Sequence, residues 1–158
     1  MRTILATLEL KAETDPVLSQ ATALAKACGA KLWVLHVAAP EPDFVGYQAG
    51  PQYIRDVRAS DLKQERHRMQ SLMAGLVAQQ VDASSIMVFG PTAETILHEA
   101  ERLGADLIVM GTHGRSGLAK AFLGSTSDDV LRANRFNVLI VPPVNPRGTQ
   151  VEQPTWVD

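Results

Sequence analysis

A glycine-rich segment in the last third of the chain combines the residue types that bind phosphate. A short apolar run, 106–110 (DLIVM), leads into Gly111, Gly114 and then Gly124-Ser125, the spacing G-x2-G-x9-G-S. Glycine has no Cβ, so a ligand can approach the backbone closely. A helix N-terminus offers unpaired N–H groups and partial positive charge, which suits an anion. The segment therefore predicts a loop that cradles the phosphates of a nucleotide.

Side chains within the same segment could add to that cradle. His113 and Arg115 lie between the glycines, and both side chains can donate hydrogen bonds to phosphate oxygens. Ser125 has two interpretations. With Asp128 it matches the S-x-x-D pattern that caps a helix start, or its hydroxyl meets phosphate instead.

No catalytic or metal-binding constellation accompanies the loop. His36, His67 and His98 are scattered over three elements without metal-ligand spacing, and there is no G-x-S-x-G nucleophile motif. Cys28, the single cysteine, falls on the apolar face of a predicted helix, where we expect a small buried residue. The sequence thus predicts no catalytic residue and no protein-bound metal, and a Mg²⁺ carried by the nucleotide stays open.

Five apolar runs alternate with four helical patterns along the chain. The expected strands are 3–8, 31–37, 85–89, 106–110 and 137–141, and the expected helices are 16–28, 61–81, 92–103 and 125–134. Asp15, Thr92 and Ser125 are the expected helix caps, and Gly29 and Gly104 the expected helix ends. The stretch 38–60 is expected to be a long connection, either a passive excursion or a lid or dimer contact.

Strands that alternate with helices predict an α/β fold with one open parallel sheet, covered by helices on both faces. With right-handed crossovers, the strand order is 3-2-1-4-5 if strands one to three are laid outward and the fourth crosses back beside the first. Ligands bind such sheets outside the carboxyl ends of the strands, where the strand order reverses. That point lies between the first and fourth strands, so the glycine loop is expected beside Thr7 and Glu9, with Val37 as the next neighbour.

Length and composition predict a single cytoplasmic domain. The chain has 158 residues and a net charge of -2, and it has no basic block of the kind that binds nucleic acid. It has no apolar run near the length of a membrane span, and it enters its first strand without a leader. We expect a domain over 1–143 and a loosely ordered tail over 144–158.

Several segments together resemble the universal stress protein family of the ATP-binding type. The matching words are the G-x2-G-x9-G-[ST] motif, Leu35-His36-Val37, the turn 90–94 (GPTAE) and the run 105–115 (ADLIVMGTHGR). The resemblance extends from Arg2 to about Pro143. It implies the Rossmann-like fold of the adenine nucleotide alpha hydrolases, ATP (or AMP or ADP) as ligand, a homodimer and a role in stress survival.

The resemblance also implies site residues by position. Phosphate contacts fall on Gly111, Gly114, Gly124 and Ser125, with Met110, His113, Arg115, Thr126 and Ser127 alongside. Val37 takes the position that lines the adenine, and Thr7 and Glu9 lie at the end of the first strand. The family usually has aspartate where this chain has Glu9, which is one methylene longer.

A nucleotide-responsive switch or scaffold in stress response is therefore the predicted function. The alternatives are a slow ATPase or nucleotide hydrolase, and an interaction protein of the same fold that binds no nucleotide. The fifth strand, Asn137 to Val141, lies at a sheet edge, and an apolar edge is a liability unless covered. Pairing across a two-fold axis would cover it, in agreement with the homodimer that the resemblance implies.

Overall fold

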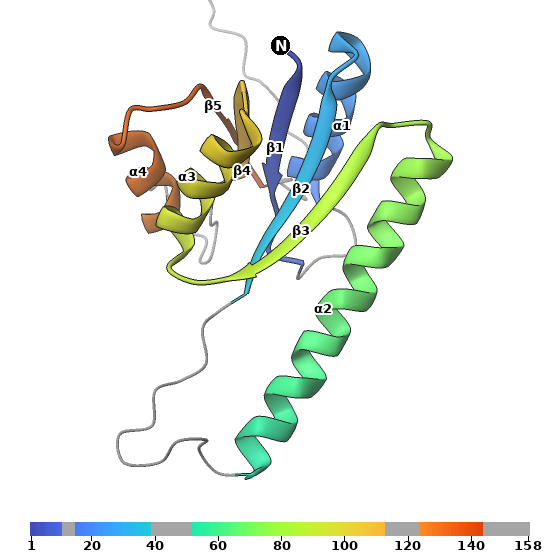
Figure 1. Ribbon diagram of the computed structural model, residues 1–158, viewed down its shortest axis with the longest axis vertical. Coiled ribbons are helices and arrows are strands. Elements are labelled where there is room, and N and C mark those ends of the chain that lie inside the picture. The colour runs from blue at the N-terminus through green and yellow to red at the C-terminus, as the bar shows by residue number, and fades with distance from the viewer. Residues whose placement is uncertain (11–14, 39–51, 113–123, 144–158) are drawn as a thin grey trace, which may run out of the picture.

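The computed structural model describes residues 1–10, 15–38, 52–112 and 124–143 (Figure 1). The strands are β1 (Thr3–Thr7), β2 (Lys31–Ala38), β3 (Ala83–Phe89), β4 (Leu107–Gly111) and β5 (Val138–Val141). The helices are α1 (Pro16–Cys28), α2 (Gln52–Ala78), α3 (Thr92–Leu103) and α4 (Ser125–Arg132). Within these residues no helix is both long and apolar enough to cross a membrane.

The five strands form one parallel sheet in the order β3-β2-β1-β4-β5, as predicted. β1 lies at the centre, with Leu5 opposite Trp33 of β2 on one side and Ile108 of β4 on the other. The chain order reverses between β1 and β4. The chain segments that follow these two strands therefore diverge, toward opposite faces of the sheet, at the predicted binding edge.

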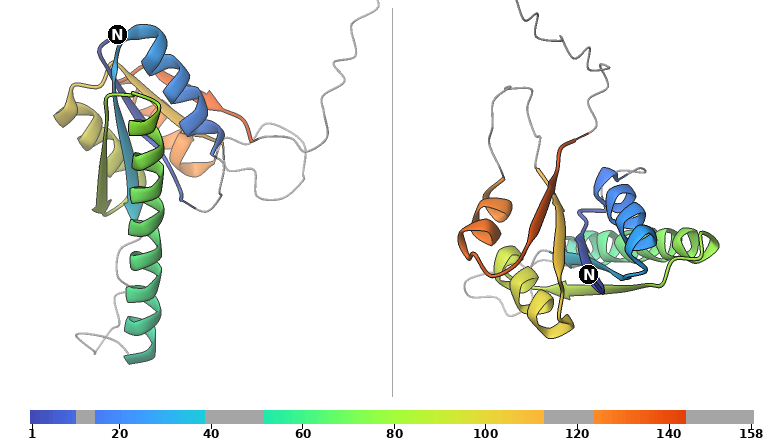
Figure 2. Two further views of the ribbon diagram at one scale, coloured as in Figure 1. Left: turned by 90° about the vertical axis from the view of Figure 1, so that its right-hand side faces the viewer. Right: turned by 90° about the horizontal axis from the view of Figure 1, so that it is seen from above.

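The sheet separates two apolar layers (Figure 2). α1 and α2 cover one face, where Ala21 and Met69 pack with Ile4 of β1. α3 and α4 cover the other face, where Ile96 and Val130 pack with Leu5. Alternate residues of β1 thus enter opposite layers, as the period-two geometry of a strand requires.

Sequence signals at both ends of α1 act as predicted. The Asp15 carboxylate accepts a hydrogen bond from the Val17 N–H at 2.8 Å, and Pro16 is the first helical residue. Gly29 ends the helix in the left-handed conformation, at φ 60°. The expectation for Cys28 is wrong: its side chain is exposed, because the last residue of α1 turns away from the sheet.

α2 begins at Gln52, well before the expected Asp61. In the sequence, the apolar Tyr53, Ile54 and Val57 are followed by the polar Ser60 and Asp61, so the hydrophobic periodicity does not run on into the expected helix, and Val57 is exposed. Figures 1 and 2 show the reason, since this end of α2 runs past the sheet and has no strand beneath it. The 38–60 stretch is therefore helical in its second part, and residues 39–51 lie outside the described part.

Two predicted helix caps are shifted by one residue. Pro91 occupies the cap position of α3 and Gly124 that of α4, and neither helix start has a side-chain cap hydrogen bond. Thr92 and Ser125 are instead the first residues of their helices. Sequence patterns identify the start of a helix more reliably than the residue that caps it.

Asp106 joins the starts of β1 and β4. Its carboxylate accepts hydrogen bonds from the N–H groups of Arg2 and Thr3, and these bonds lower the pKa of Asp106 below its ordinary value of 3.8. Because folding favours the charged form, the carboxylate contributes stability above pH 3.8, which is lost as the pH falls through the lowered pKa.

Asp106→Asn is therefore expected to lower the free energy of unfolding at neutral pH. The difference from the unmodified protein should stay constant down to about pH 5 and narrow below the ordinary pKa, because the carboxylate of the unfolded chain then takes up a proton while the native one stays charged until the lowered pKa. Urea unfolding followed by circular dichroism at several pH values measures this difference. A difference that stays the same from pH 7 to pH 3 would contradict the assignment.

Candidate functional site at the carboxyl edge of the sheet

A pocket of about 710 Å³ opens at the carboxyl ends of β1, β2 and β4. The strand ends and the starts of α1, α3 and α4 form its floor, and α2 forms one wall. Its lining residues are Thr7, Leu8, Glu9, Asp15, Pro16, Val17, Leu35, His36, Val37, Arg58, Glu65, Thr92, Ile96, Met110, Gly111, Thr112, Thr126, Val141 and Pro143. The volume falls within the range of small-molecule sites.

Residues predicted from three strands and one helix meet in this pocket. Those that line it are Thr7, Glu9, Val37, Met110, Gly111 and Thr126. Gly124 and Ser125 adjoin it at the start of α4 but are not among its lining residues, and Ser125 is exposed. His113, Gly114 and Arg115 lie outside the described residues.

Ser127 lies beneath the pocket rather than in its lining. Its side chain is fully buried, and its hydroxyl donates a hydrogen bond to the Gly111 carbonyl at 3.0 Å. This bond ties the first turn of α4 to the end of β4. The bond thereby holds the first turn of α4 in place, and Thr126 of that turn lines the pocket.

Gly111 is also tightly packed against α1. A Cβ on this residue would lie 3.2 Å from Cγ2 of Val17, at the start of α1. The first turn of α1 therefore packs directly against the backbone of β4. The first glycine of the motif has a structural role in addition to any contact with phosphate.

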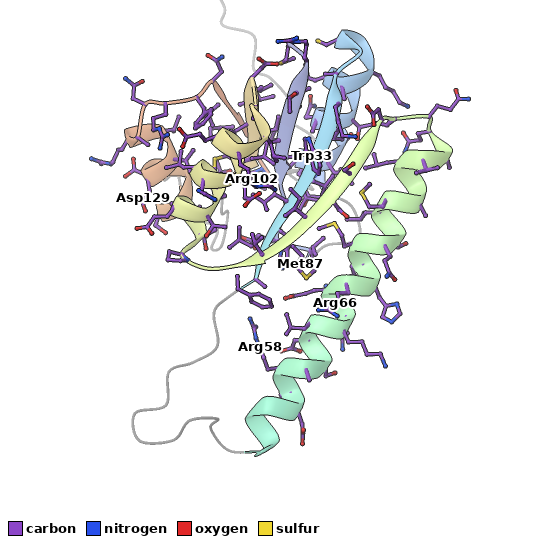
Figure 3. All side chains as sticks on the ribbon, viewed as in Figure 1. Trp33, Arg58, Arg66, Met87, Arg102 and Asp129 are labelled. Carbon is purple, nitrogen blue, oxygen red and sulfur yellow. The ribbon has the colours of Figure 1, made fainter. Side chains whose placement is uncertain are left out.

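Charged side chains line the pocket from three segments: the stretch after β1, the start of α1 and α2. Glu9 and Asp15 approach from the segment between β1 and α1, and Glu65 and Arg58 from α2. Figure 3 shows the Arg58 side chain directed from α2 toward the carboxyl end of β2. Burial raises the pKa of Asp15, and the nearby Glu9 adds to that rise, against the hydrogen bonds from the N–H groups of Val17 and Leu18.

The β4–α4 end of the pocket differs in character. Gly111, Thr112 and Thr126 supply backbone and hydroxyl groups there. Asp128, in the first turn of α4, forms an ion pair with Arg132 at 2.7 Å and does not line the pocket. Uncharged donors thus predominate at the β4–α4 end, where Asp15 at the neighbouring start of α1 is the acidic side chain of the pocket nearest to Gly111.

His36 connects the pocket to its α2 wall. The ring is 5% exposed, with Nδ1 2.8 Å from the Leu8 carbonyl oxygen and Nε2 3.4 Å from Oε2 of Glu65. Farther along α2, Arg68 donates a hydrogen bond to the Leu10 carbonyl. Both contacts fix the segment that follows β1, which carries Glu9.

Sequence reasoning did not place Asp15, His36, Arg58 and Glu65 in the site. The helix cap accounts for Asp15, and His36 enters only as part of the Leu35-His36-Val37 word and as a residue without metal-ligand spacing. Arg58 fell in the stretch expected to be a loop. Only the register of α2 against the sheet brings Arg58 and Glu65 to the pocket, and no local pattern encodes that register. Among the residues that the structure describes, no three His, Cys, Asp or Glu side chains come together as a metal site.

Comparison with known proteins gives matches along most of the chain. The model of the universal stress protein family matches residues 1–142. Universal stress protein A homolog 2 of Coxiella burnetii is 34% identical over 142 residues, which cover 87% of this chain and 92% of that protein.

Solved structures share the same fold. One is the universal stress protein from Archaeoglobus fulgidus in complex with dAMP, with a TM-score of 0.62 and 15% identity over 89% of this chain and 97% of that one. Another is a universal stress protein in complex with cAMP, with a TM-score of 0.57 and 22% identity over 89% of this chain and 96% of that one.

Proposed function

Because this chain belongs to the universal stress protein family, we propose that it is a cytoplasmic nucleotide-responsive switch or scaffold whose domain, residues 1–143, binds an adenine nucleotide. ATP is the proposed ligand, and ADP and AMP, which carry fewer phosphates, are the alternatives. One observation carries the proposal: Thr7, Val37, Gly111 and Thr126, chosen from separate parts of the sequence, line one pocket at the switch point of the sheet. The dAMP and cAMP complexes of structurally similar proteins support the same ligand class.

The charge distribution gives the ligand a direction in the pocket. Glu9 and Glu65 repel phosphates, so these belong at the β4–α4 end, against the backbone of Gly111 and the first N–H groups of α4. Met110 precedes that turn, and Gly114, Gly124, Ser125, His113 and Arg115 complete the proposed cradle. A Mg²⁺ ion bound to the phosphates would offset their charge without requiring a ligand from the protein.

The sugar and base then occupy the β1–β2 end. Carboxylates accept hydrogen bonds from hydroxyl groups, so Glu9 suits a ribose. Val37 and Ile96 provide apolar surface for a flat base. Glu9 is longer than the aspartate usual in the family, and Asp15 supplies a second carboxylate in the pocket, at the start of α1.

Two measurements test the proposal. Acid extraction of freshly purified protein followed by chromatography identifies any nucleotide that it retains. Calorimetry of nucleotide-free protein with AMP, ADP and ATP in the presence of Mg²⁺ then gives the affinities. Absence of binding at millimolar nucleotide would reject the proposal in favour of an interaction protein that uses the fold alone, and release of phosphate or AMP over time would identify a hydrolase instead.

We further propose that the protein forms a homodimer through the outer edge of β5, which no other strand of the described residues covers. Hydrogen bonds to β4 use the carbonyls of Asn137 and Val141, at 2.9 and 3.1 Å. Because backbone groups alternate in direction along a strand, Val138 and Ile140 turn their N–H and C=O groups away from β4. These groups can pair with the same strand of a second copy.

Val138→Pro is accordingly expected to convert the dimer to monomers while the fold is kept. Proline removes an outward N–H and is tolerated at the first residue of a strand. Size-exclusion chromatography with light scattering gives the mass, and circular dichroism checks the fold. Val138→Ala, which keeps the N–H, is the matched control and should remain dimeric. A Val138→Pro protein that is still a dimer would exclude this edge as the interface.

A further inference from the structure

The ladder between β1 and β2 stops where the pocket begins. The Lys31 N–H donates to the Arg2 carbonyl, and the Leu35 carbonyl accepts from the Leu8 N–H, both at 2.9 Å. The Leu32 N–H donates on the other side, to Asp82. Odd-numbered residues of β2 therefore direct their backbone groups toward β1, and even-numbered residues toward β3.

Val37 is the next odd-numbered residue, and in a continued ladder its N–H would donate to the Leu8 carbonyl. The paired residues end instead with Thr7 opposite Leu35. The Leu8 carbonyl accepts from the ring of His36, at 2.8 Å from Nδ1. Within the described residues, no hydrogen bond joins the Val37 N–H to Leu8. The Val37 backbone thus faces the gap between the strands, and Val37 lines the pocket.

The geometry also determines which ring nitrogen carries hydrogen. A carbonyl oxygen only accepts, so Nδ1 of His36 must hold the proton that it donates to Leu8. Nε2 faces Oε2 of Glu65 at 3.4 Å, and both atoms are buried. The ring is therefore held between the end of β1 and α2, and an ion pair with Glu65 forms whenever Nε2 is protonated as well.

We propose that His36 is a positioning residue for the base of the bound nucleotide. By satisfying the Leu8 carbonyl, its ring replaces the next rung of the ladder and leaves the N–H and C=O of Val37 available to the ligand. A donor and an acceptor side by side match the ring nitrogen and amino group on one edge of adenine. This inference rests on the proposed function, since it requires a nucleotide in the pocket.

Paired substitutions of His36 test the proposal. His36→Leu removes the donor, so the Leu8 carbonyl becomes free to accept from Val37 and close the gap. His36→Asn keeps an N–H on the same γ-carbon and should rescue the bond to Leu8. Calorimetry with AMP is expected to show a loss of roughly threefold to tenfold in affinity for His36→Leu, the size of one net hydrogen bond, and affinity near that of the unmodified protein for His36→Asn.

Ribose 5-phosphate, which has the sugar and phosphate but no base, separates positioning from general damage. Its affinity should be the same for all three proteins, whereas a merely structural role would weaken both ligands equally. Equal AMP affinity for His36→Leu and the unmodified protein would overturn the proposal, and so would failure of His36→Asn to rescue binding.

Hydrogen exchange of the unmodified protein provides a test that does not depend on folding of the variants. The Val37 amide should exchange fast without ligand and slowly when AMP is bound. An amide already protected without AMP would overturn the role of His36 while leaving nucleotide binding intact. If the unmodified protein bound no adenine nucleotide, the proposed function would fail, and this inference with it.

Discussion

Replacement of Gly124 by valine is expected to weaken adenine nucleotide binding at least tenfold, or roughly 1.4 kcal/mol. Gly124 occupies the cap position of α4, and its carbonyl accepts the first hydrogen bond of the helix, from the Asp128 N–H at 3.0 Å. Its φ of -58° is open to any residue, so valine fits the backbone. The added methyl groups would occupy space at the helix start where phosphate must approach. Calorimetry with ATP and Mg²⁺ measures the loss.

Ala133→Val is the matched control for this change. It places the same side chain at the opposite end of the same helix, at the C-cap of α4, about 12 Å away along its axis. It should leave the affinity unchanged, and thermal unfolding of both variants reports any loss of fold. If Gly124→Val binds nucleotide as well as the control does, the start of α4 is not the phosphate cradle.

Gly90→Ala is expected to lower the free energy of unfolding by roughly 1–3 kcal/mol. Gly90 lies between β3 and α3 with φ 151°, a conformation that other residues rarely adopt. A Cβ there would also lie 2.6 Å from Oγ1 of Thr95, in the first turn of α3. Backbone strain and the collision therefore both lower the free energy of unfolding, and urea unfolding measures the combined effect.

The same substitution at Gly75 should act in the opposite direction. Gly75 lies inside α2, and a Cβ there would have no neighbour within 4 Å. Alanine should therefore stabilise the protein, by about 0.5–1 kcal/mol. Gly90→Ala combined with Thr95→Ala separates the two causes, because it relieves the collision and keeps the strain. Equal stability of the Gly90→Ala variant and the unmodified protein would show that the turn adapts at no cost.

The sheet could be predicted from sequence because its central strands, β1, β2 and β4, are largely buried apolar runs bounded by strong local signals. Gly29 and Gly104 end their helices in the left-handed conformation, and Asp15 caps α1, as their residue types indicate. The start of α2 could not be predicted in the same way. Where α2 has no strand beneath it, its apolar residues do not continue the stripe of the later turns, so Arg58 falls in the stretch expected to be a long connection.

The site shows a similar division. Residues in the turn after a strand, such as Glu9, were placed because the ends of parallel strands meet at one edge. Glu65 was missed because its place depends on how α2 lies across the sheet. Ser127 shows a third case: a motif predicts its position, but only the structure shows that its hydroxyl hydrogen-bonds Gly111.

The orientation of α1 has a practical consequence for fluorescence experiments. Its first residue, Pro16, lines the pocket, whereas Cys28 is exposed at the other end, about 20 Å along the helix axis. Cys28 is also the only cysteine in the sequence. A maleimide dye would therefore attach at one known point without obstructing the pocket. Energy transfer between two labelled copies could then report association and nucleotide binding in the same sample.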